Sequence, residues 1–256
     1  MVYPHPTRLL VLDIDGTTLA KGETALSETL SATFATLNSR GVRVALATSR
    51  APQRVTSLGL NPTWCPEVIV CGGGAVLDVA TGELRDVTLL PPPTLQSIGW
   101  ELHKMGEGDE VAWAQCAPHG PWYAQDVVRV ASLPDGTDWG LKLSARLRTH
   151  DPHSTAELLR SAVGEAFSLT SSGRTNLEVA GPGASKRAAV VRLARSLHLA
   201  SRDVVGVGNG PNDVDFLEWV GWSVAVAPLD QELGRAVDEV IEAPDLASWI
   251  TRHFRL

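Results

Sequence analysis

Two aspartates separated by one residue follow the first apolar run of the chain, in "LLVLDIDGTTL" (residues 9–19). In extended backbone, residues two apart point to one side, so the carboxylates of Asp13 and Asp15 would share a face. Carboxylates directly after a buried run are costly unless a metal or hydrogen bonds compensate them. Gly16 and Thr17 predict a tight turn whose free backbone N–H groups suit a phosphate. We therefore expect phosphate or metal chemistry here, rather than a plain turn with two solvated acids.

Two further segments carry groups that bind oxyanions. In "ATSR", Thr48 and Ser49 offer hydroxyls and Arg50 offers a planar fork of N–H donors. A simple helix cap is the alternative interpretation of this segment. In "GPGASKRAAV", Lys186 stands in the first turn of a predicted helix, where the helix dipole disfavours a positive charge. That position suggests that Lys186 has a functional role, and the alternative is a solvated surface lysine.

A Gly-rich loop, "GVGNGPND" (206–213), ends a later apolar run. Asn209, Asn212 and Asp213 bring oxygen donors to the end of a predicted strand, and such donors suit a hard cation such as Mg²⁺. Gly, Asn and Asp are also the usual residues of turns and helix caps. Taken alone, this loop leaves both interpretations open.

Three familiar motifs are excluded by single positions. A calcium loop that starts at Asp13 would need Gly and Glu where the chain has Thr18 and Thr24. A P-loop would need Ser or Thr after Lys186, where Arg187 stands. The dinucleotide fingerprint would need Gly at Pro211.

The segments around these residues predict an α/β core. Short apolar runs predict buried strands over residues 8–12, 42–48 and 67–73, with helices between them. Such alternation predicts a parallel sheet with right-handed crossovers. After about residue 184 the same alternation returns. In sheets of this kind, functional groups gather at the carboxyl ends of the strands, where most of these polar residues lie.

Between these two parts the pattern changes to strands that follow strands. A hairpin is predicted over 75–87 about Thr81 and Gly82, and an antiparallel α+β unit follows it. The fold class we expect is α/β: a Rossmann-like parallel-sheet core formed by 1–79 and 178–256, interrupted by an inserted α+β domain over 80–177. Four tryptophans fall inside the insert, and we expect them to pack its core, with stacking on a sugar or a base as the alternative: Trp100, Trp113, Trp122 and Trp139.

Composition limits the kind of partner. The 256 residues carry a formal net charge of −7, which argues against nucleic acid or an anionic membrane as the main partner. No run of 18 apolar residues occurs, and the first residues lack the pattern of a signal peptide, so we expect a soluble, cytoplasmic protein that is a monomer or a homodimer. The three cysteines have no CxxC spacing and are expected to be buried apolar residues: Cys65, Cys71 and Cys116.

Five segments in this order resemble the haloacid dehalogenase-like hydrolase superfamily, and most closely its Cof-type (subfamily IIB) phosphatases: "LDIDGTTL", "ALATSR", "CGGGAVLD", "SKRAAV" and "GNGPND". Members of that branch carry a large cap inserted after the third core strand. Three positions depart from the family pattern. Ser49 stands for Gly, Gly73 for Asn, and Asn209 for the Asp that usually ligates the metal.

The resemblance implies a Mg²⁺-dependent phosphatase that hydrolyses a small phosphorylated metabolite, such as a sugar phosphate, through an aspartyl-phosphate. By this resemblance Asp13 is the nucleophile, Asp15 is the general acid and base, and the insert is a lid. The residues implied to hold the phosphate are Thr48 and Lys186, with Gly16, Ser49, Arg50 and Asn212 beside them. The implied Mg²⁺ ligands are Asp13, the Asp15 carbonyl, Asn209 and, directly or through water, Asp213.

Two other functions stay open at this point. A phosphomutase would share Asp15 and would depend on a bisphosphate. A non-catalytic protein that binds phosphate or sugar is suggested by Asn209, which replaces a usual metal ligand.

Overall fold

The structure is a computed structural model that describes residues 7–20, 22–107, 111–116, 123–128, 139–148, 151–165, 167–172, 175–228 and 233–256. The strands of its larger sheet are β1 (Leu9–Asp13), β2 (Arg43–Ala47), β3 (Glu67–Val70), β4 (Ala75–Asp78), β5 (Leu84–Arg85), β11 (Val204–Gly208), β12 (Trp222–Ala227) and β13 (Glu239–Glu242). Their order across the sheet is β13-β12-β11-β1-β2-β3-β4-β5. β1 lies at the centre and pairs in parallel with β2 and β11, and only β4 and β5 run antiparallel to their neighbours. The predicted α/β fold class with a parallel-sheet core is confirmed.

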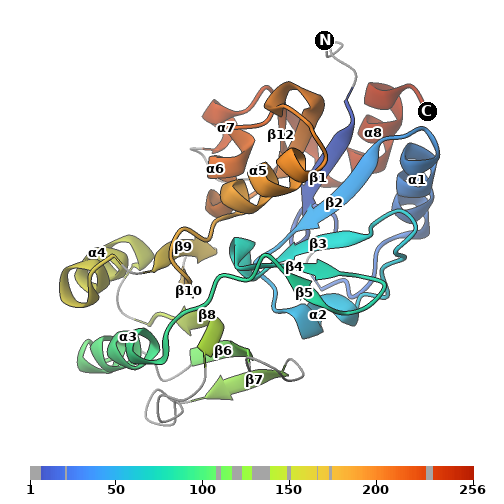
Figure 1. Cartoon of the computed structure of the whole chain (residues 1–256). Helices are drawn as coiled ribbons and strands as arrows, with labels where there is room; N and C mark the ends of the chain where they lie inside the picture. The colour runs from blue at the N-terminus through green and yellow to red at the C-terminus, as the bar shows by residue number, and fades with distance from the viewer. Residues whose placement is uncertain are drawn as a thin grey trace.

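Helices cover both faces of this sheet (Figure 1). Along β1, Leu10 and Leu12 point to one hydrophobic cluster, whereas Leu9 and Val11 point to another. The first cluster is closed by α1 (Glu28–Ser39), α2 (Pro52–Thr56) and α8 (Leu246–Phe254). The second is closed by α5 (Lys186–Ser196), α6 (Val214–Leu217) and α7 (Leu233–Ala236). Because both faces are buried, the core strands read as continuous apolar runs, and this explains why the sequence predicts them well.

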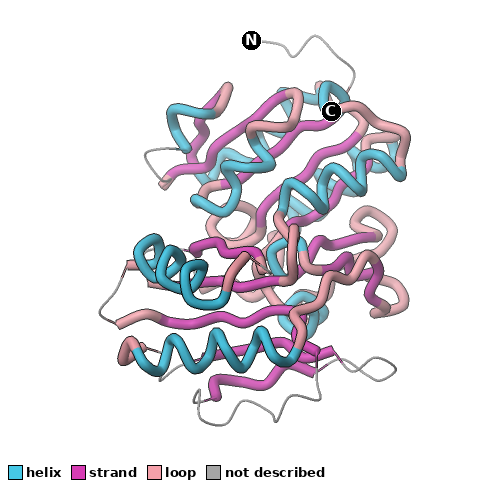
Figure 2. The backbone as a smooth tube through the Cα atoms, turned by 60° about the vertical axis from the view of Figure 1, so that its left-hand side comes forward, coloured by secondary structure: helices cyan, strands magenta, loops and turns pink. Residues whose placement is uncertain are grey.

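A second sheet lies beyond the carboxyl ends of the core strands (Figures 1 and 2). Its strands are β6 (Val111–Cys116), β7 (Tyr123–Val128), β8 (Trp139–Arg146), β9 (Ser168–Ser172) and β10 (Asn176–Ala180), in the order β7-β6-β8-β10-β9. Their pairing is antiparallel. Two helices, α3 (Pro92–Lys104) and α4 (Pro152–Val163), pack on one face of it around a hydrophobic cluster of their own. No helix in the described ranges is long and apolar enough to cross a membrane.

Sheet membership differs from the predicted insert boundaries at both ends. β5 lies inside 80–177, yet it pairs with β4 in the larger sheet, because the hairpin extends the antiparallel pairing of β3 with β4. At the other end, β10 continues past residue 177, and Ala180 still pairs with Lys142 of β8. β10 itself is not among the strands predicted from the sequence. Sheet membership therefore favours an insert that runs from residue 86 to residue 180.

Candidate functional site

A buried lysine joins two buried aspartates at the carboxyl end of the core sheet. Lys186 Nζ donates to Asp13 Oδ1 at 2.5 Å and to Asp213 Oδ1 at 2.6 Å. The three side chains are 1%, 7% and 0% exposed, respectively. One ammonium thus faces two carboxylates inside the protein, so this cluster carries an excess of negative charge.

Burial and the neighbouring charges shift the protonation of this cluster. Burial raises the pKa of Asp13 to about 7; Lys186 opposes the shift, and the Asp213 carboxylate adds to it. Burial by itself would lower the pKa of Lys186, but the two carboxylates outweigh it and raise that pKa above its ordinary value. The lysine therefore stays charged, while Asp13 is the group that a further positive charge would ionise.

Close backbone packing positions Lys186. It is the first residue of α5, whose N-cap is Ser185, with Oγ accepting from the Ala188 N–H at 3.1 Å. Gly73 has φ +100°, and a Cβ there would collide with the Ser185 carbonyl. The absence of a side chain at Gly73 thus lets the turn after β3 support the start of α5. The close contact explains why this chain has Gly at position 73, where the family usually has Asn.

The N–H groups of the turn after Asp13 donate hydrogen bonds to carbonyls of the same turn. Gly16 N–H donates to the Leu19 carbonyl at 2.8 Å, and Thr17 N–H donates to the Ile14 carbonyl at 3.3 Å. The prediction of free N–H groups at these two residues is therefore wrong, because the turn closes on itself. Gly16 serves another purpose: a Cβ there would collide with the Asn209 side-chain amide.

The Asp213 carboxylate holds the backbone of the Gly-rich loop by hydrogen bonds. Its Oδ2 accepts the N–H groups of Asn209 and Gly210 at 2.9 and 3.0 Å, while Oδ1 accepts from Lys186. A Cβ at Gly208 would collide with the Asp213 carboxylate, so glycine is needed there. Both oxygens of Asp213 are therefore already engaged, which favours the water-mediated form of its predicted metal contact.

The "ATSR" segment lies beside this loop. Thr48 is fully buried, and its Oγ1 accepts from the Arg50 N–H at 3.0 Å. Asn212 Nδ2 donates to Ser49 Oγ at 3.2 Å. The structure thus brings together Ser49 and Asn212, which are far apart in the sequence and were both predicted to contact phosphate.

Asp15 and Arg50 pair with each other. Arg50 Nε and Nη2 donate to the two carboxylate oxygens of Asp15 at 2.9 and 2.7 Å. The hydrogen bond that Arg50 donates to the Asp15 carboxylate raises the pKa of Arg50. The Asp15 side chain is 59% exposed, outside the Lys186 cluster. The family resemblance implies separate roles for these two residues, whereas their complementary planar groups here pair with each other.

The donor set fits a magnesium ion, although it is poor in acids. No group of three or more His, Cys, Asp or Glu side chains able to hold a metal occurs within the described residues. Asp13 Oδ2 and the Asn209 side chain have no hydrogen bond in that same part of the chain, and no hydrogen bond of the 14–19 turn uses the Asp15 carbonyl. These oxygens, beside a buried excess of negative charge, suit a hard cation with only one direct carboxylate ligand.

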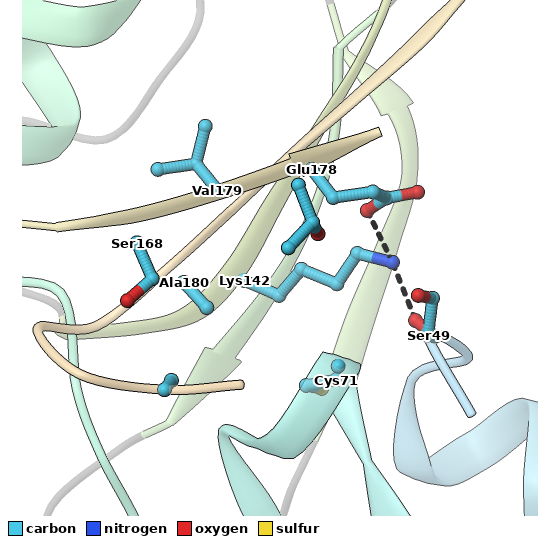
Figure 3. A pocket seen from close by; sticks show the side chains of 10 residues that line it. Ser49, Cys71, Lys142, Ser168, Glu178, Val179 and Ala180 are labelled. Carbon is cyan, nitrogen blue, oxygen red and sulfur yellow. Dashed lines mark hydrogen bonds and ion pairs between the residues drawn. The ribbon is translucent and has the colours of Figure 1, made fainter. Parts of the chain in front are cut away.

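The insert contributes a lysine that is not among the residues predicted from the sequence. Lys142 of β8 is buried, forms an ion pair with Glu178 of β10, and donates to the Ser49 carbonyl (Figure 3). Alternation along β8 could have indicated it, because Lys142 directly precedes Leu143, which packs under α3 and α4, and so faces the other side of the strand.

Trp100 does not pack the core of the insert. It is 61% exposed on α3, with its ring centroid 5.8 Å from that of His103, because the buried face of this helix is formed by other residues. The side chains of Trp113 and Trp139, and all of Trp122, lie outside the described residues. Cys65 and Cys71 are buried, as predicted, and the side chain of Cys116 lies outside that description.

The chain is similar to phosphatases along most of its length. It is 26% identical to an HMP-PP phosphatase of Escherichia coli O157:H7, over 84% of this chain and 82% of that protein. It is 24% identical to the 5-amino-6-(5-phospho-D-ribitylamino)uracil phosphatase YcsE of Bacillus subtilis, over 93% and 88%.

The fold is shared with solved structures of low sequence identity. A HAD subclass IIB sugar phosphatase, BT4131, superposes with a TM-score of 0.77 at 15% identity, over 97% of this chain and 99% of that one. A family profile described as haloacid dehalogenase-like hydrolase matches residues 10–123 and 138–246, which include every predicted site residue. The resemblance noted in the sequence is confirmed: the chain belongs to the haloacid dehalogenase-like hydrolase family.

Proposed function

We propose that the protein is a Mg²⁺-dependent phosphatase that hydrolyses a small phosphorylated metabolite through an aspartyl-phosphate on Asp13. The observation that carries the proposal is the Asp13 carboxylate at the end of β1, with one oxygen held by Lys186 and the other without a hydrogen bond among the described residues. That second oxygen is available to attack phosphorus. The two relatives named as phosphatases support the same class of reaction.

In the first step, Asp13 Oδ2 forms a bond to the phosphorus atom while the bond to the leaving oxygen breaks. Lys186 holds the nucleophile in place through Oδ1 and presents positive charge where negative charge develops. The buried Thr48 hydroxyl contacts a phosphoryl oxygen. A proton passes from Asp15 to the leaving oxygen.

In the second step, Asp15 takes a proton from water, and that water attacks the phosphorus of the aspartyl-phosphate. Phosphate leaves and Asp13 is regenerated. For both transfers the Asp15 carboxyl must turn from Arg50 toward Asp13. Arg50 then becomes available to the phosphate, as the sequence analysis expected.

Asp13, the Asp15 carbonyl and Asn209 are the residues that would hold Mg²⁺, with Asp213 behind them. When bound, the ion supplies positive charge between the Asp13 carboxylate and the substrate phosphate. It also favours the ionised form of Asp13, whose pKa of about 7 would otherwise leave much of it protonated at neutral pH.

The proposal is tested by hydrolysis of p-nitrophenyl phosphate with Mg²⁺. Asp13→Asn keeps the shape of the side chain but removes the nucleophile, so turnover should fall by about a thousandfold or more, with an unchanged melting temperature. Asp86→Asn, the same substitution at an exposed position, is the matched control. Wild-type turnover by Asp13→Asn would overturn the aspartyl-phosphate mechanism. Turnover only with an added sugar bisphosphate would instead indicate a phosphomutase.

A further inference from the structure

Three consecutive carbonyls of the segment after β2 accept hydrogen bonds. The Gly72 N–H donates to the Thr48 carbonyl, and the Cys71 N–H donates to the Arg50 carbonyl, both at 2.9 Å. Both donors are backbone groups of the turn after β3, so the core itself holds the two outer carbonyls. The middle carbonyl, that of Ser49, has its donor in the insert.

The insert reaches the Ser49 carbonyl through Lys142. The ammonium group lies between this carbonyl and the Glu178 carboxylate (Figure 3). Glu178 Oε2 also accepts from Ser144 Oγ at 2.6 Å, which orients the carboxylate. The residue before the lysine, Leu141, is fully buried in the hydrophobic cluster of the core. Because β8 is anchored to the core at that point, Lys142 is a fixed donor rather than a loose surface contact.

The contact with Lys142 orients a whole peptide unit. The Ser49 carbonyl and the Arg50 N–H belong to one planar trans peptide unit, so they point in opposite directions. On the far side of that unit, the Arg50 N–H donates to Thr48 Oγ1 at 3.0 Å. Lys142 therefore fixes the plane of this peptide unit, and the peptide unit fixes which lone pair of the Thr48 hydroxyl is occupied.

The Thr48 hydroxyl keeps its own donor for a ligand. A hydroxyl has one O–H donor and two lone pairs. Thr48 is fully buried, and its Oγ1 accepts from the Arg50 N–H but donates to no group in the part of the chain that the structure describes. A buried donor without a partner is costly, so a phosphoryl oxygen that accepts from it is stabilised there.

We propose that Lys142 is a positioning residue for phosphoryl transfer, which directs the Thr48 hydroxyl at the phosphoryl group by holding the Ser49 carbonyl. The inference rests on the proposed phosphatase function. Lys142 acts through the peptide unit between residues 49 and 50 and touches no reacting atom. Its influence falls on the phosphoryl group, which every substrate shares. Without Lys142 the two outer carbonyls keep their core donors, so the segment stays in place while its middle peptide unit is free to rotate.

A double-mutant cycle tests this route, with p-nitrophenyl phosphate and Mg²⁺. Lys142→Met keeps the stem of the side chain and removes its donors, so kcat/KM should fall by about ten- to a hundredfold. Thr48→Val, which removes the hydroxyl, should cause a loss of similar size. In the Thr48→Val background, Lys142→Met should lower kcat/KM by less than about twofold, because the group that it positions is already absent. Lys104→Met removes an exposed lysine of α3, and as the matched control it should leave kcat/KM unchanged.

A second variant separates positioning from stability. Lys142→Met leaves the buried Glu178 carboxylate without this ammonium, which should lower the melting temperature. The further substitution Glu178→Gln removes the charge, so the melting temperature should recover while the loss of kcat/KM remains. If kcat/KM recovered together with the melting temperature, the role of Lys142 would be structural and the inference would be overturned.

The leaving group gives the last control. Lys142→Met should lower kcat/KM for p-nitrophenyl phosphate and for glycerol 2-phosphate by the same factor, within about twofold, and should weaken inhibition by inorganic phosphate. A loss confined to one of the two esters would overturn the inference and leave the phosphatase proposal intact. So would losses in Lys142→Met and Thr48→Val that multiply in the double variant. Turnover of neither ester by the wild-type protein would overturn the proposed function and this inference with it.

Discussion

Asn209 stands where a carboxylate would give the candidate metal site a second direct anionic ligand. Its side chain lies over Gly16 and forms no hydrogen bond with the described residues. An amide oxygen can ligate Mg²⁺, but it carries no full charge. A unit charge 4 Å from another is worth ~4 kcal/mol at an effective dielectric of about 20, and desolvation of the carboxylate offsets part of this.

We therefore expect Asn209→Asp to tighten Mg²⁺ binding by about 1–3 kcal/mol, or roughly tenfold to a hundredfold. The half-saturating Mg²⁺ concentration for turnover should fall, with a smaller change in the rate at saturation. Asn61→Asp adds the same charge at an exposed position and should change neither. Mass spectrometry should first verify the amide in the Asn209–Gly210 pair. If wild type binds no Mg²⁺ at millimolar levels and Asn209→Asp gains both binding and turnover, the natural protein is a non-catalytic relic.

The two described thiols should be inert in the folded protein. Burial raises the pKa of both Cys65 and Cys71 to about 12, whereas unfolded thiols ionise near pH 9. The reactive form is the thiolate, so at pH 8 neither should react with Ellman's reagent until the chain unfolds. In a Cys116→Ser background, two thiols should appear only in denaturant, and fast labelling of the native protein would contradict this.

The raised pKa values of these two thiols also make the stability of the protein depend on pH. Above pH 9 the unfolded state loses protons that the folded state keeps, so the free energy of unfolding should fall as pH rises. The slope is about 1.4 kcal/mol per pH unit for each thiol.

At the scale of the elements, the contact between the turn after β3 and the start of α5 depends on Gly73. Gly73→Ala should destabilise the protein by more than about 3 kcal/mol, because it adds a collision with the start of α5 to the strain of a positive φ. Gly82→Ala is the matched control, since Gly82 also has a positive φ, +73°, but open space around it. It should cost only about 1–2 kcal/mol. Equal losses in urea denaturation would show that the close approach of the two segments is unimportant.

Sequence patterns predict elements better than they predict contacts between them. The core strands follow from their apolar runs, and two residues of typical helix-end type flank α1: the N-cap Ser27 and Gly41, which has a positive φ. β10 escaped prediction because "NLEVA" is short and interrupted by an acid. The pairing of Asp15 with Arg50 joins residues 35 positions apart, and nothing local in the sequence specifies it. For the same reason Lys142 was missed: its partners, Ser49 and Glu178, come from two distant segments.

On the scale of the whole molecule, each sheet has its own hydrophobic cluster, although Leu141 of β8 packs into the core cluster, and this arrangement supports two cooperative units. Leu159→Ala in α4 should remove about 2–5 kcal/mol from the insert alone. Amide hydrogen exchange should then accelerate in α3, α4, β8 and β10 while β1 and β11 stay protected. Leu193→Ala in α5 should give the opposite pattern. Uniform acceleration across both sheets by Leu159→Ala would contradict the division into two domains.

The two strands that pair with the central strand β1 are synthesised at very different times during translation. β1 ends at residue 13 and β2 follows soon after, but its other neighbour, β11, begins at residue 204. At roughly 5–20 residues per second, a ribosome needs about ten to forty seconds to synthesise the chain between them. During that time the inner edge of β1 lacks its partner, and Leu9 and Val11 lack the covering helix α5. A nascent chain that stops after the insert therefore displays an open strand edge and a bare apolar face. Such a chain is a substrate for chaperones and prone to aggregation until its last quarter emerges.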